Sequence, residues 1–311
     1  MKLDERKPEE IEQQITTPVN RGDQTDVEQM ETVSPWRDAW RRLRKNRFAM
    51  AGMIIILFFL ILALIAPLLT SYSYYEQNLA NRLLPPSGEH WMGTDDLGRD
   101  ILTRIAYGAR VSLQVGFFAV IGALVFGTFL GIIAGYFGRW VDMIISRIFD
   151  ILLAFPSILL AIAIVAILGA SLQNALIAIA IINIPIFGRI VRSRVISLRA
   201  EEYIMAAKAQ GMKNGRIIFH HILPNSITPI IVQATLGFGT AILEAAALGF
   251  LGLGAQPPTP EWGQMLASSR EFIQLAPWTL IMPGVSIMLV VLGFNLVGDG
   301  LRDVLDPKMR N

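Results

Sequence analysis

Charged side chains are scarce in this chain, and cysteine is absent. Asp, Glu, Lys and Arg make up 17% of the 311 residues, whereas soluble domains usually carry about 25%. Without cysteine, the chain can form no disulfide, thiolate metal site or thiol nucleophile. A Walker A motif is also missing, since Gly211-Met-Lys-Asn-Gly215 has neither its spacing nor its Lys-Ser/Thr ending. The sequence therefore excludes thiol chemistry and a P-loop ATPase site of its own.

Long stretches of the chain carry no ionisable side chain at all. A spanning helix needs about 20 consecutive apolar residues, and charge-free stretches occur at residues 48–70, 111–137, 151–188, 222–243 and 273–298. The stretch 151–188 is too long for one span, and Gly169-Ala-Ser-Leu-Gln-Asn174 divides it. The sequence therefore predicts an all-α integral membrane protein with six spans, at about residues 48–69, 111–136, 141–168, 175–191, 227–251 and 278–301.

Basic residues gather in three segments beside these spans. They lie at residues 37–47 before the first span, 189–216 between the fourth and fifth, and 302–310 after the sixth. Cytoplasmic loops of membrane proteins are enriched in Lys and Arg, and with six spans the three segments share one side. We therefore expect a multi-pass protein of the cytoplasmic membrane with both termini in the cytoplasm.

This orientation divides the chain into five parts. We expect a disordered cytoplasmic tail at 1–35, a basic segment with the first span at 36–70, an extracytoplasmic loop at 71–108, a transmembrane domain of five helices at 109–305 and a short tail at 306–311. The N-terminal stretch is polar and lacks the apolar core of a signal peptide. In the extracytoplasmic loop, Thr94 or Asp95 is expected to cap a helix at residues 97–107 that lies near the membrane surface.

One polar segment, residues 197–225, interrupts the apolar stretches of the second half. It predicts an amphipathic helix at Arg199–Gln210, whose apolar face carries Tyr203, Ile204, Ala206 and Ala207. Gly211 is placed to end that helix in a left-handed cap, and Ile217–Leu223 predicts a second helical turn that Pro224 stops. Such a segment is either a solvated interfacial helix or an element that another protein grips.

The spacing in this segment resembles a known motif. Glu202-x-x-x-Ala206-Ala207-x-x-x-Gly211, followed by Leu223-Pro224, resembles the EAA loop of binding-protein-dependent ABC importer permeases. Residues 93–113, 221–229, 244–263 and 294–307 also resemble the C-type permease of the dipeptide/oligopeptide (and nickel) branch, so that the resemblance covers about residues 36–307. One departure is Met205, where the family has the Glu that names the motif. If that Glu is needed for motor contact, Glu202 has to replace it.

The resemblance implies a six-helix permease of the type I ABC importer kind with a cytoplasmic coupling helix, in a prokaryotic membrane. It implies motor coupling through Glu201, Glu202, Ala206, Ala207, Gly211, Leu223 and Pro224. The implied partners are a second homologous permease, two ATP-binding subunits and an extracytoplasmic peptide-binding protein, which we expect to contact Asp95, Asp96, Arg99 and Trp262. This chain would bind no cofactor or metal, since ATP and Mg²⁺ belong to the ATPase partners, and no nucleic acid.

Polar residues inside the predicted spans have several possible roles. Glu244 is the only acid of the fifth span and is either a structural carboxyl between helices or part of the translocation path. Asn295 and Asp299 could line the same path. In the third span, Arg147 and Asp150 are three residues apart and are expected to pair, near Asp142.

Small residues in the second span predict a close helix contact. Gly127, Gly131 and Gly135 recur at four-residue spacing, which suits packing inside the bundle or against the second permease.

On this reading we expect the chain to take part in ATP-driven import of dipeptides or oligopeptides. Nickel, a metal chelate or glutathione are alternative substrates of the same architecture. An ion-coupled secondary transporter is an alternative of another class, supported only by Glu244. The adjacent residues His220 and His221 diverge by about 100° on a helix and make a poor metal site, and no catalytic constellation is present among the predicted helices.

Overall fold

The structure of the protein, a computed structural model, describes residues 35–305, with the backbone alone at 35–38. The predicted tails therefore fall outside it, except for Pro35. The chain divides at Trp40 into two units, and the second, from Arg41, holds the spanning helices. Within the described range no strand occurs, and a single bridge joins Thr94 and Asp100.

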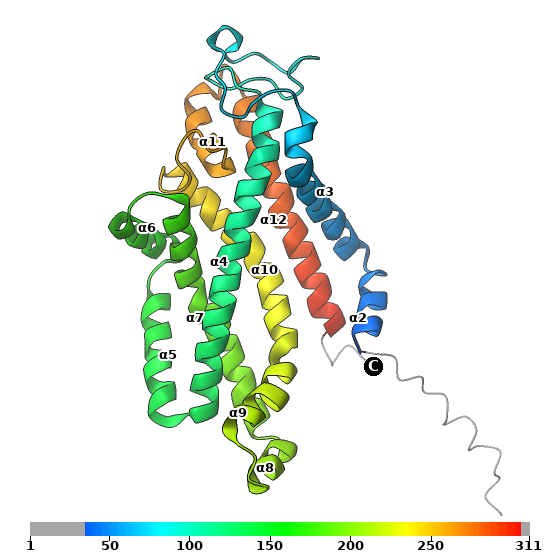
Figure 1. The fold of residues 1–311 in the computed structure, drawn as a ribbon, viewed down its shortest axis with the longest axis vertical. Coiled ribbons are helices and arrows are strands. Elements are labelled where there is room, and N and C mark those ends of the chain that lie inside the picture. The colour runs from blue at the N-terminus through cyan, green and yellow to red at the C-terminus, as the bar shows by residue number, and fades with distance from the viewer. Residues whose placement is uncertain (1–34, 306–311) are drawn as a thin grey trace, which may run out of the picture. The chain divides into compact units, whose positions relative to one another are not determined.

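The predicted all-helical architecture is confirmed (Figure 1). Five helices are long and apolar enough to cross a membrane: α3 (Arg47–Leu69), α4 (Ile101–Phe137), α7 (Leu172–Arg199), α10 (Leu223–Phe250, continuous with the turns from Asn214) and α12 (Trp278–Leu305). The bent pair α5 (Arg139–Ala154) and α6 (Ser157–Leu168) makes a sixth if counted as one span. The shorter elements are α2 (Pro35–Leu43), η2 (Leu79–Asn81), α8 (Glu202–Ala209), α9 (Asn214–Ile217), η3 (Ile218–Ile222), α11 (Trp262–Ser269) and η4 (Arg270–Phe272).

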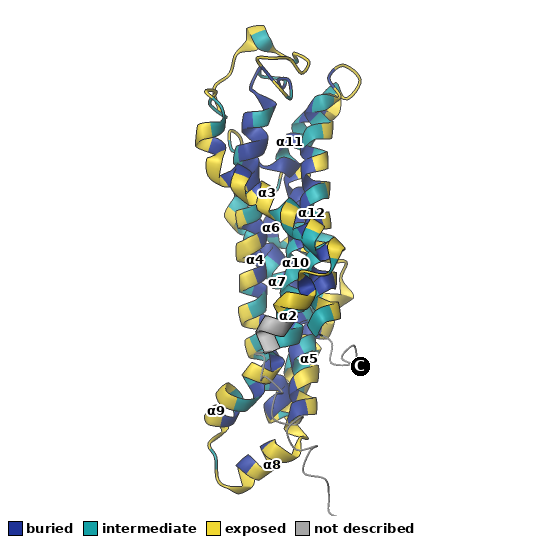
Figure 2. Ribbon diagram, turned by 90° about the vertical axis from the view of Figure 1, so that its right-hand side faces the viewer, coloured by how far each residue is buried: buried dark blue, intermediate teal, exposed yellow. Residues whose placement is uncertain are grey.

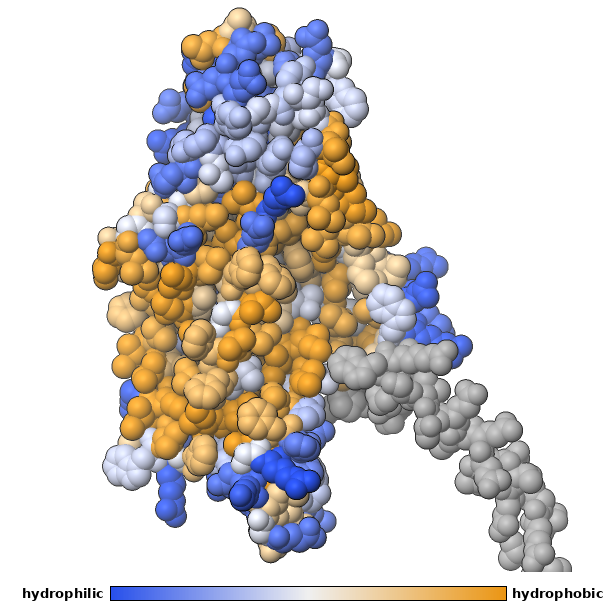
Figure 3. Space-filling view, in the orientation of Figure 1, coloured by the Kyte–Doolittle hydropathy of each residue, from blue (hydrophilic) through white to orange (hydrophobic). Residues whose placement is uncertain are grey.

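The bundle has two polar ends and an apolar middle. Residues 70–100 and α11 lie at one end, called here the loop end, and α8 and α9 lie at the other, the α8 end (Figure 1). Hydrophobic side chains cover most of the middle of the face seen in Figure 3, and hydrophilic ones gather at both ends. Buried residues run along α4 and α7 while the outer faces are exposed (Figure 2), as expected of helices whose outer sides meet lipid.

Helices α4 and α7 make the most extensive helix contact of the bundle. The glycine row of α4 lies directly on the α7 backbone. A Cβ at Gly131 would come within 2.5 Å of the Gly188 carbonyl oxygen, and one at Gly135 within 2.8 Å of the Arg192 carbonyl oxygen. The predicted packing role of these glycines inside the bundle is confirmed.

Two predicted boundaries are wrong. The second span and the predicted surface helix 97–107 form one continuous helix, α4, whose N-cap is Asp100 rather than Thr94 or Asp95. The third span, predicted as one helix over 141–168, bends by 95° between α5 and α6. Pro156 explains the bend, because proline has no N–H and disfavours helical geometry in the preceding residue, Phe155, which is extended (φ −94°, ψ 143°).

The α4–α7 contact yields a stability prediction. We expect Gly131→Ala to destabilise the bundle by about 1–3 kcal/mol, because the new methyl group has to displace backbone. Gly284→Ala in α12 is the matched control, since its Cβ meets only Leu266 Cδ2 at 3.8 Å. Thermal unfolding of the purified protein in detergent compares the two, and equal midpoints would contradict the packing role of Gly131.

Candidate functional site

Helix α8 and the turns after it form the candidate site at the α8 end. Helix α7 ends at Arg199, and α8 begins at Glu202. The Glu202 carboxylate lies in the first turn of α8, where a negative charge interacts favourably with the helix dipole. The helix ends in a Schellman motif: Met212 N–H donates to the Ala207 carbonyl oxygen (3.1 Å), and Gly211 N–H donates to that of Lys208 (3.0 Å). Gly211 has φ +77°, which confirms the predicted left-handed cap.

The buried face of α8 is narrower than the apolar face predicted from the sequence. Only Ile204 and Ala207 are buried. Ile204 belongs to an apolar cluster with Ile217, Ile222 and residues of α4 and α7. Tyr203 and Ala206, which the sequence assigned to the same face, are exposed. The reason is the short helix: with eight residues, only the pair three positions apart reaches the bundle.

The other predicted coupling positions lie mostly on the outside. Glu201, Glu202, Ala206, Gly211 and Pro224 are exposed, Leu223 is half-buried and Ala207 is buried. Met205, at the position of the motif Glu, is 53% exposed. The outer face of α8 therefore presents a small residue, Ala206, between the larger side chains of Glu202, Tyr203 and Met205. Of these, Tyr203 reaches back to α10, where its hydroxyl accepts from Asn225 Nδ2 (3.5 Å).

Pro224 does not stop a helix, contrary to the prediction. Helical turns run on from Asn214 through α9 and the π turn η3 into α10, and Pro224 sits in the first turn of α10. The π turn shifts the hydrogen-bond register, because Leu223 N–H donates to the Ile218 carbonyl oxygen. Two side chains donate hydrogen bonds to backbone carbonyl oxygens near the proline. Asn225 Nδ2 donates to the His221 carbonyl oxygen (2.6 Å), and Ser226 Oγ donates to that of Ile222 (2.8 Å).

Tyr136, at the end of α4, holds this loop in place and was not singled out from the sequence. Its hydroxyl donates to Asn214 Oδ1 (2.7 Å), and its carbonyl oxygen accepts from Arg199 Nη1 (3.1 Å). The Lys208 ammonium lies 4.9 Å from the centre of the Tyr136 ring. Burial, followed by the positive charge of Arg199, lowers the pKa of Lys208. A tyrosine at the end of an apolar span is the signal that could have indicated it.

We expect Tyr136→Phe to loosen this loop without unfolding the bundle. The substitution removes one hydrogen bond, worth about 1 kcal/mol, and keeps the ring against Lys208. Faster amide hydrogen exchange confined to residues 202–217 is the expected result. Tyr75→Phe at the loop end is the control, since the Tyr75 hydroxyl has no hydrogen-bond partner among the described residues. Unchanged hydrogen exchange in Tyr136→Phe would show that the Tyr136 hydroxyl does not hold this loop in place.

At the loop end, a buried network shapes residues 70–104. Asp95 Oδ1 accepts from the N–H groups of Leu97 and Arg99 (both 2.9 Å), and its Oδ2 accepts from Arg99 Nε (2.7 Å) and lies 3.4 Å from Arg104 Nε. Asp100 accepts from Thr103, and its Oδ1 lies 3.0 Å from His90 Nδ1. These carboxylates thus tie the loop to the first turn of α4.

This network limits the predicted contact with an external binding protein. Asp95 and Arg99 expose only 8% and 5% of their residue surface, and Trp262 is fully buried. These three residues therefore lie beneath the surface. Asp96 is half-buried, and its burial, together with the charge of Asp95, raises its pKa. The contact itself stays a prediction for all four residues; Asp96 is the most accessible of them, and the other three support the surface from below.

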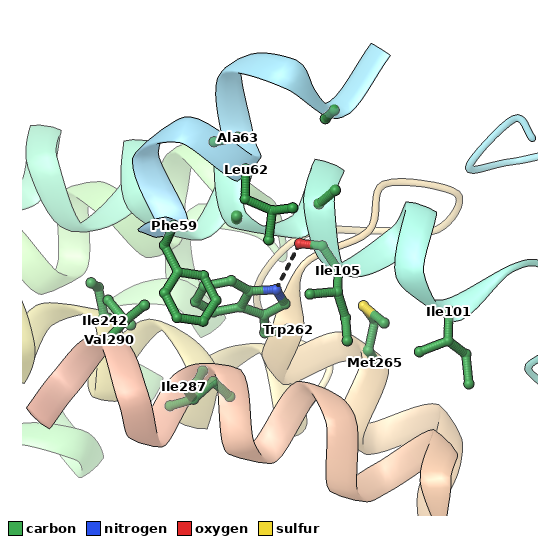
Figure 4. Close-up of a cluster of buried hydrophobic side chains, with 14 residues drawn as sticks. Phe59, Leu62, Ala63, Ile101, Ile105, Ile242, Trp262, Met265, Ile287 and Val290 are labelled. Atoms are coloured by element: carbon green, nitrogen blue, oxygen red, sulfur yellow. Dashed lines mark hydrogen bonds between the residues drawn. The ribbon is translucent and has the colours of Figure 1, made fainter. Parts of the chain in front are cut away.

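Trp262 anchors α11 in the apolar core of the loop end (Figure 4). Its Nε1 donates to the Ile105 carbonyl oxygen of α4 (3.2 Å), and its ring meets Phe59 of α3 edge to face at 5.5 Å. The preceding residue, Glu261, caps α11 by accepting from the N–H groups of Gly263 (2.8 Å) and Gln264 (2.9 Å). Burial raises the pKa of Glu261 despite these two bonds.

The raised pKa of Glu261 gives stability a pH dependence. Because the folded-state pKa lies above the unfolded value of about 4.3, the folded state binds the proton more tightly, and its advantage is lost as the pH rises through the folded pKa. We therefore expect the unfolding midpoint of the parent protein to fall relative to that of Glu261→Gln as the pH rises above about 4.3. Exposed Glu271→Gln is the control; parallel curves for parent and Glu261→Gln would contradict the expectation.

Glu244 makes a contact between helices. Its Oε2 accepts a hydrogen bond from Asn183 Nδ2 of α7 (2.8 Å), and the same amide nitrogen donates to the Ile179 carbonyl oxygen (2.9 Å). Asn295 and Asp299 on α12 are exposed, and a Cβ at Gly239 would lie 3.2 Å from Asn295 Oδ1. The structure thus brings Glu244 to α7, and within the described residues no hydrogen bond or ion pair joins it to Asn295 or Asp299.

Ion pairs join α5 to α7 in a way the sequence did not indicate. Asp150 lies 2.6 Å from Arg189 rather than pairing with Arg147, and Asp142 receives two hydrogen bonds from Arg192. The predicted Arg147–Asp150 pair is wrong because the tertiary packing of α5 on α7 offers Asp150 a closer arginine. These pairs lie near the α8 end.

Comparison with known proteins places this architecture in a family. Residues 127–311 match the family described as binding-protein-dependent transport system inner membrane component, and residues 34–86 match the N-terminal TM domain of oligopeptide transport permease C. The chain belongs to this family of inner membrane permeases. It is therefore a transport subunit with several membrane-spanning helices.

The relatives sharpen the placement. The chain is 76% identical to the dipeptide transport system permease protein DppC of Alkalihalophilus pseudofirmus, over 91% of this chain and 93% of the relative. It is 47% identical to the di/tripeptide permease DppC of Pseudomonas aeruginosa (89% and 94%) and 46% identical to the glutathione permease GsiD of Pectobacterium atrosepticum (89% and 93%).

The fold also matches a solved transporter. An inward-facing structure of the MetNI methionine ABC transporter aligns with a TM-score of 0.51 at 20% sequence identity, covering 63% of this chain and 94% of that one. At this identity the match concerns the fold, which is that of the type I ABC importer permeases. The fold class predicted from the sequence is thereby confirmed.

Proposed function

We propose that this permease imports dipeptides and that it takes its energy from ATPase subunits through the outer face of α8. The structural observation behind the proposal is a helix whose inner face, Ile204 and Ala207, is locked to the bundle while its outer face is free for a partner. The relatives support the substrate, since the 76% identical DppC is a dipeptide permease by its name.

The proposed assembly has five chains. This permease pairs with a second homologous permease, two ATP-binding subunits dock at the α8 end, and an extracytoplasmic peptide-binding protein docks at the loop end. The charge distribution supports this orientation: Arg189, Arg192, Arg194, Arg199, Lys208, Lys213 and Arg216 lie toward the α8 end, and Lys and Arg favour the cytoplasmic side. Both chain termini would then be cytoplasmic. The chain itself holds no cofactor, and ATP and Mg²⁺ bind to the ATPase partners.

The proposed mechanism is alternating access. Closure of the ATPase dimer around ATP moves α8 as a rigid body with the bundle, because Ile204 packs among residues of α4 and α7, and Tyr136 of α4 contacts Lys208 of α8 and Asn214 after it. The helix pair then tilts and opens the path toward the binding protein. ATP contributes only as differential stabilisation of the two states.

The translocation path remains a proposal at residue level. Glu244 of α10 is hydrogen-bonded to Asn183 of α7. Its role would therefore be to fix the position of these two helices relative to each other, rather than to bind substrate directly. Asn295 and Asp299 are exposed on α12 and are available to a cavity shared with the second permease. An ion-coupled transporter is set aside because the family is binding-protein-dependent.

Glutathione is the second candidate substrate. The permeases named GsiD are 45–46% identical to this chain over 89% of its length, and glutathione is itself a small peptide. Uptake of labelled dipeptide and labelled glutathione by the reconstituted transporter with its own binding protein distinguishes the two. Faster uptake of the dipeptide is expected.

The two faces of α8 make a matched mutational test. Ala206→Arg should leave the unfolding temperature nearly unchanged but lower dipeptide uptake and ATPase activity by more than roughly tenfold, since a large side chain blocks close docking. Ala207→Arg should also lower the unfolding temperature, because Ala207 is buried. Gly215→Ala, whose Cβ meets no atom within 4 Å, is the control. Normal uptake by Ala206→Arg would refute coupling through this face.

A further inference from the structure

A cavity of about 570 Å³ lies between α7, α10 and α12 toward the α8 end. Helix α10 supplies most of its lining, and α7 and α12 supply the remaining residues. Cavities that hold small ligands usually measure about 300–1,000 Å³, so a dipeptide fits this one. It is separate from Glu244, which does not line it.

The charged residues of the cavity are all of one sign. Arg194 of α7 and Arg302 of α12 line it, and no Asp or Glu does. Asp299 and Asp303 are near Arg302 in sequence but are not part of the lining. Arg194 Nε donates to the Asn225 carbonyl oxygen (3.3 Å), and neither arginine forms an ion pair with any described residue. Two guanidinium groups that have no carboxylate partner within residues 35–305 are therefore available to an anion.

The rest of the lining has the mixed character of a peptide site. Thr228 and Gln233 make no side-chain hydrogen bond within the described part of the chain, so both can bond a peptide backbone. Ile190, Val232 and Leu236 add apolar surface. Such surface contacts side chains of many kinds without selecting among them.

We propose that this cavity binds the C-terminal carboxylate of the transported peptide at Arg194 and Arg302. Guanidinium groups bind carboxylates with paired, charge-assisted hydrogen bonds. The C-terminal carboxylate is shared by all unmodified linear peptides, whatever their side chains, so one anchor serves the whole substrate class. The assignment rests on the proposed peptide import and adds an exit-side subsite, because the cavity lies near α8.

Peptide binding to the complete transporter in nanodiscs, without the binding protein, tests the subsite. Saturation-transfer NMR measures weak binding of alanyl-alanine and of its C-terminal amide. For the parent protein we expect the free acid to bind roughly tenfold more tightly than the amide, the usual size of a charged hydrogen-bond effect. Arg194→Gln with Arg302→Gln should bring the ratio near one, whereas the double Lys variant should retain a preference. Arg110→Gln, an exposed arginine of α4 near the loop end, is the matched control.

The outcomes separate this subsite from peptide import itself. Uptake of alanyl-alanine by the parent transporter with its binding protein tests import independently of the cavity. Equal binding of acid and amide by the parent protein, or an unchanged preference in the double Gln variant, overturns the subsite while import stands. The double Gln variant could also lose its ATPase partners while it still binds the free acid more tightly than the amide. That result would assign the two arginines to subunit contact and would also overturn the subsite.

Discussion

The close contact of α4 with α7 is the constraint on which the rest of the structure depends. The glycine row of α4 removes the side chains that would hold the two helices apart, so that Gly131 lies against the Gly188 carbonyl. In a membrane, where lipid tails are as apolar as the protein surface, such close packing is a main source of helix association. The pair therefore forms a stiff unit in the half of α4 nearer the α8 end, and α4 itself continues to the loop end.

Each end of α4 lies at one of the polar sites. At the loop end the first turn of α4 contributes Asp100 and Arg104, which fix the external loop through buried carboxylates. At the other end Tyr136 holds the segment after α7, and Arg192 joins α7 to α5. A displacement of α8 would thus be passed to two helices at once, which is the property that the proposed coupling requires.

The spans and the helix cap at Gly211 could be predicted from the sequence, because charge-free length and a glycine after an amphipathic segment act locally. The failures share a different cause. Pro224 was predicted to stop a helix but lies in the first turn of α10, after the π turn. Pro156 was not singled out, yet the third span bends there. Trp262 looked like an exposed contact residue but fills the loop-end core. A single sequence does not specify which neighbour receives a side chain.

The sequence by itself determined the membrane class, the number of apolar segments, the position of the α8 loop and the family, since these depend on composition and spacing along the chain. The tertiary structure decided which face of α8 is buried, that Glu244 bonds to Asn183, that Asp150 pairs with Arg189, and that Arg194 and Arg302 share a cavity. These are contacts between helices distant in sequence. They follow from how helices approach in three dimensions, which the periodicity of one helix does not record.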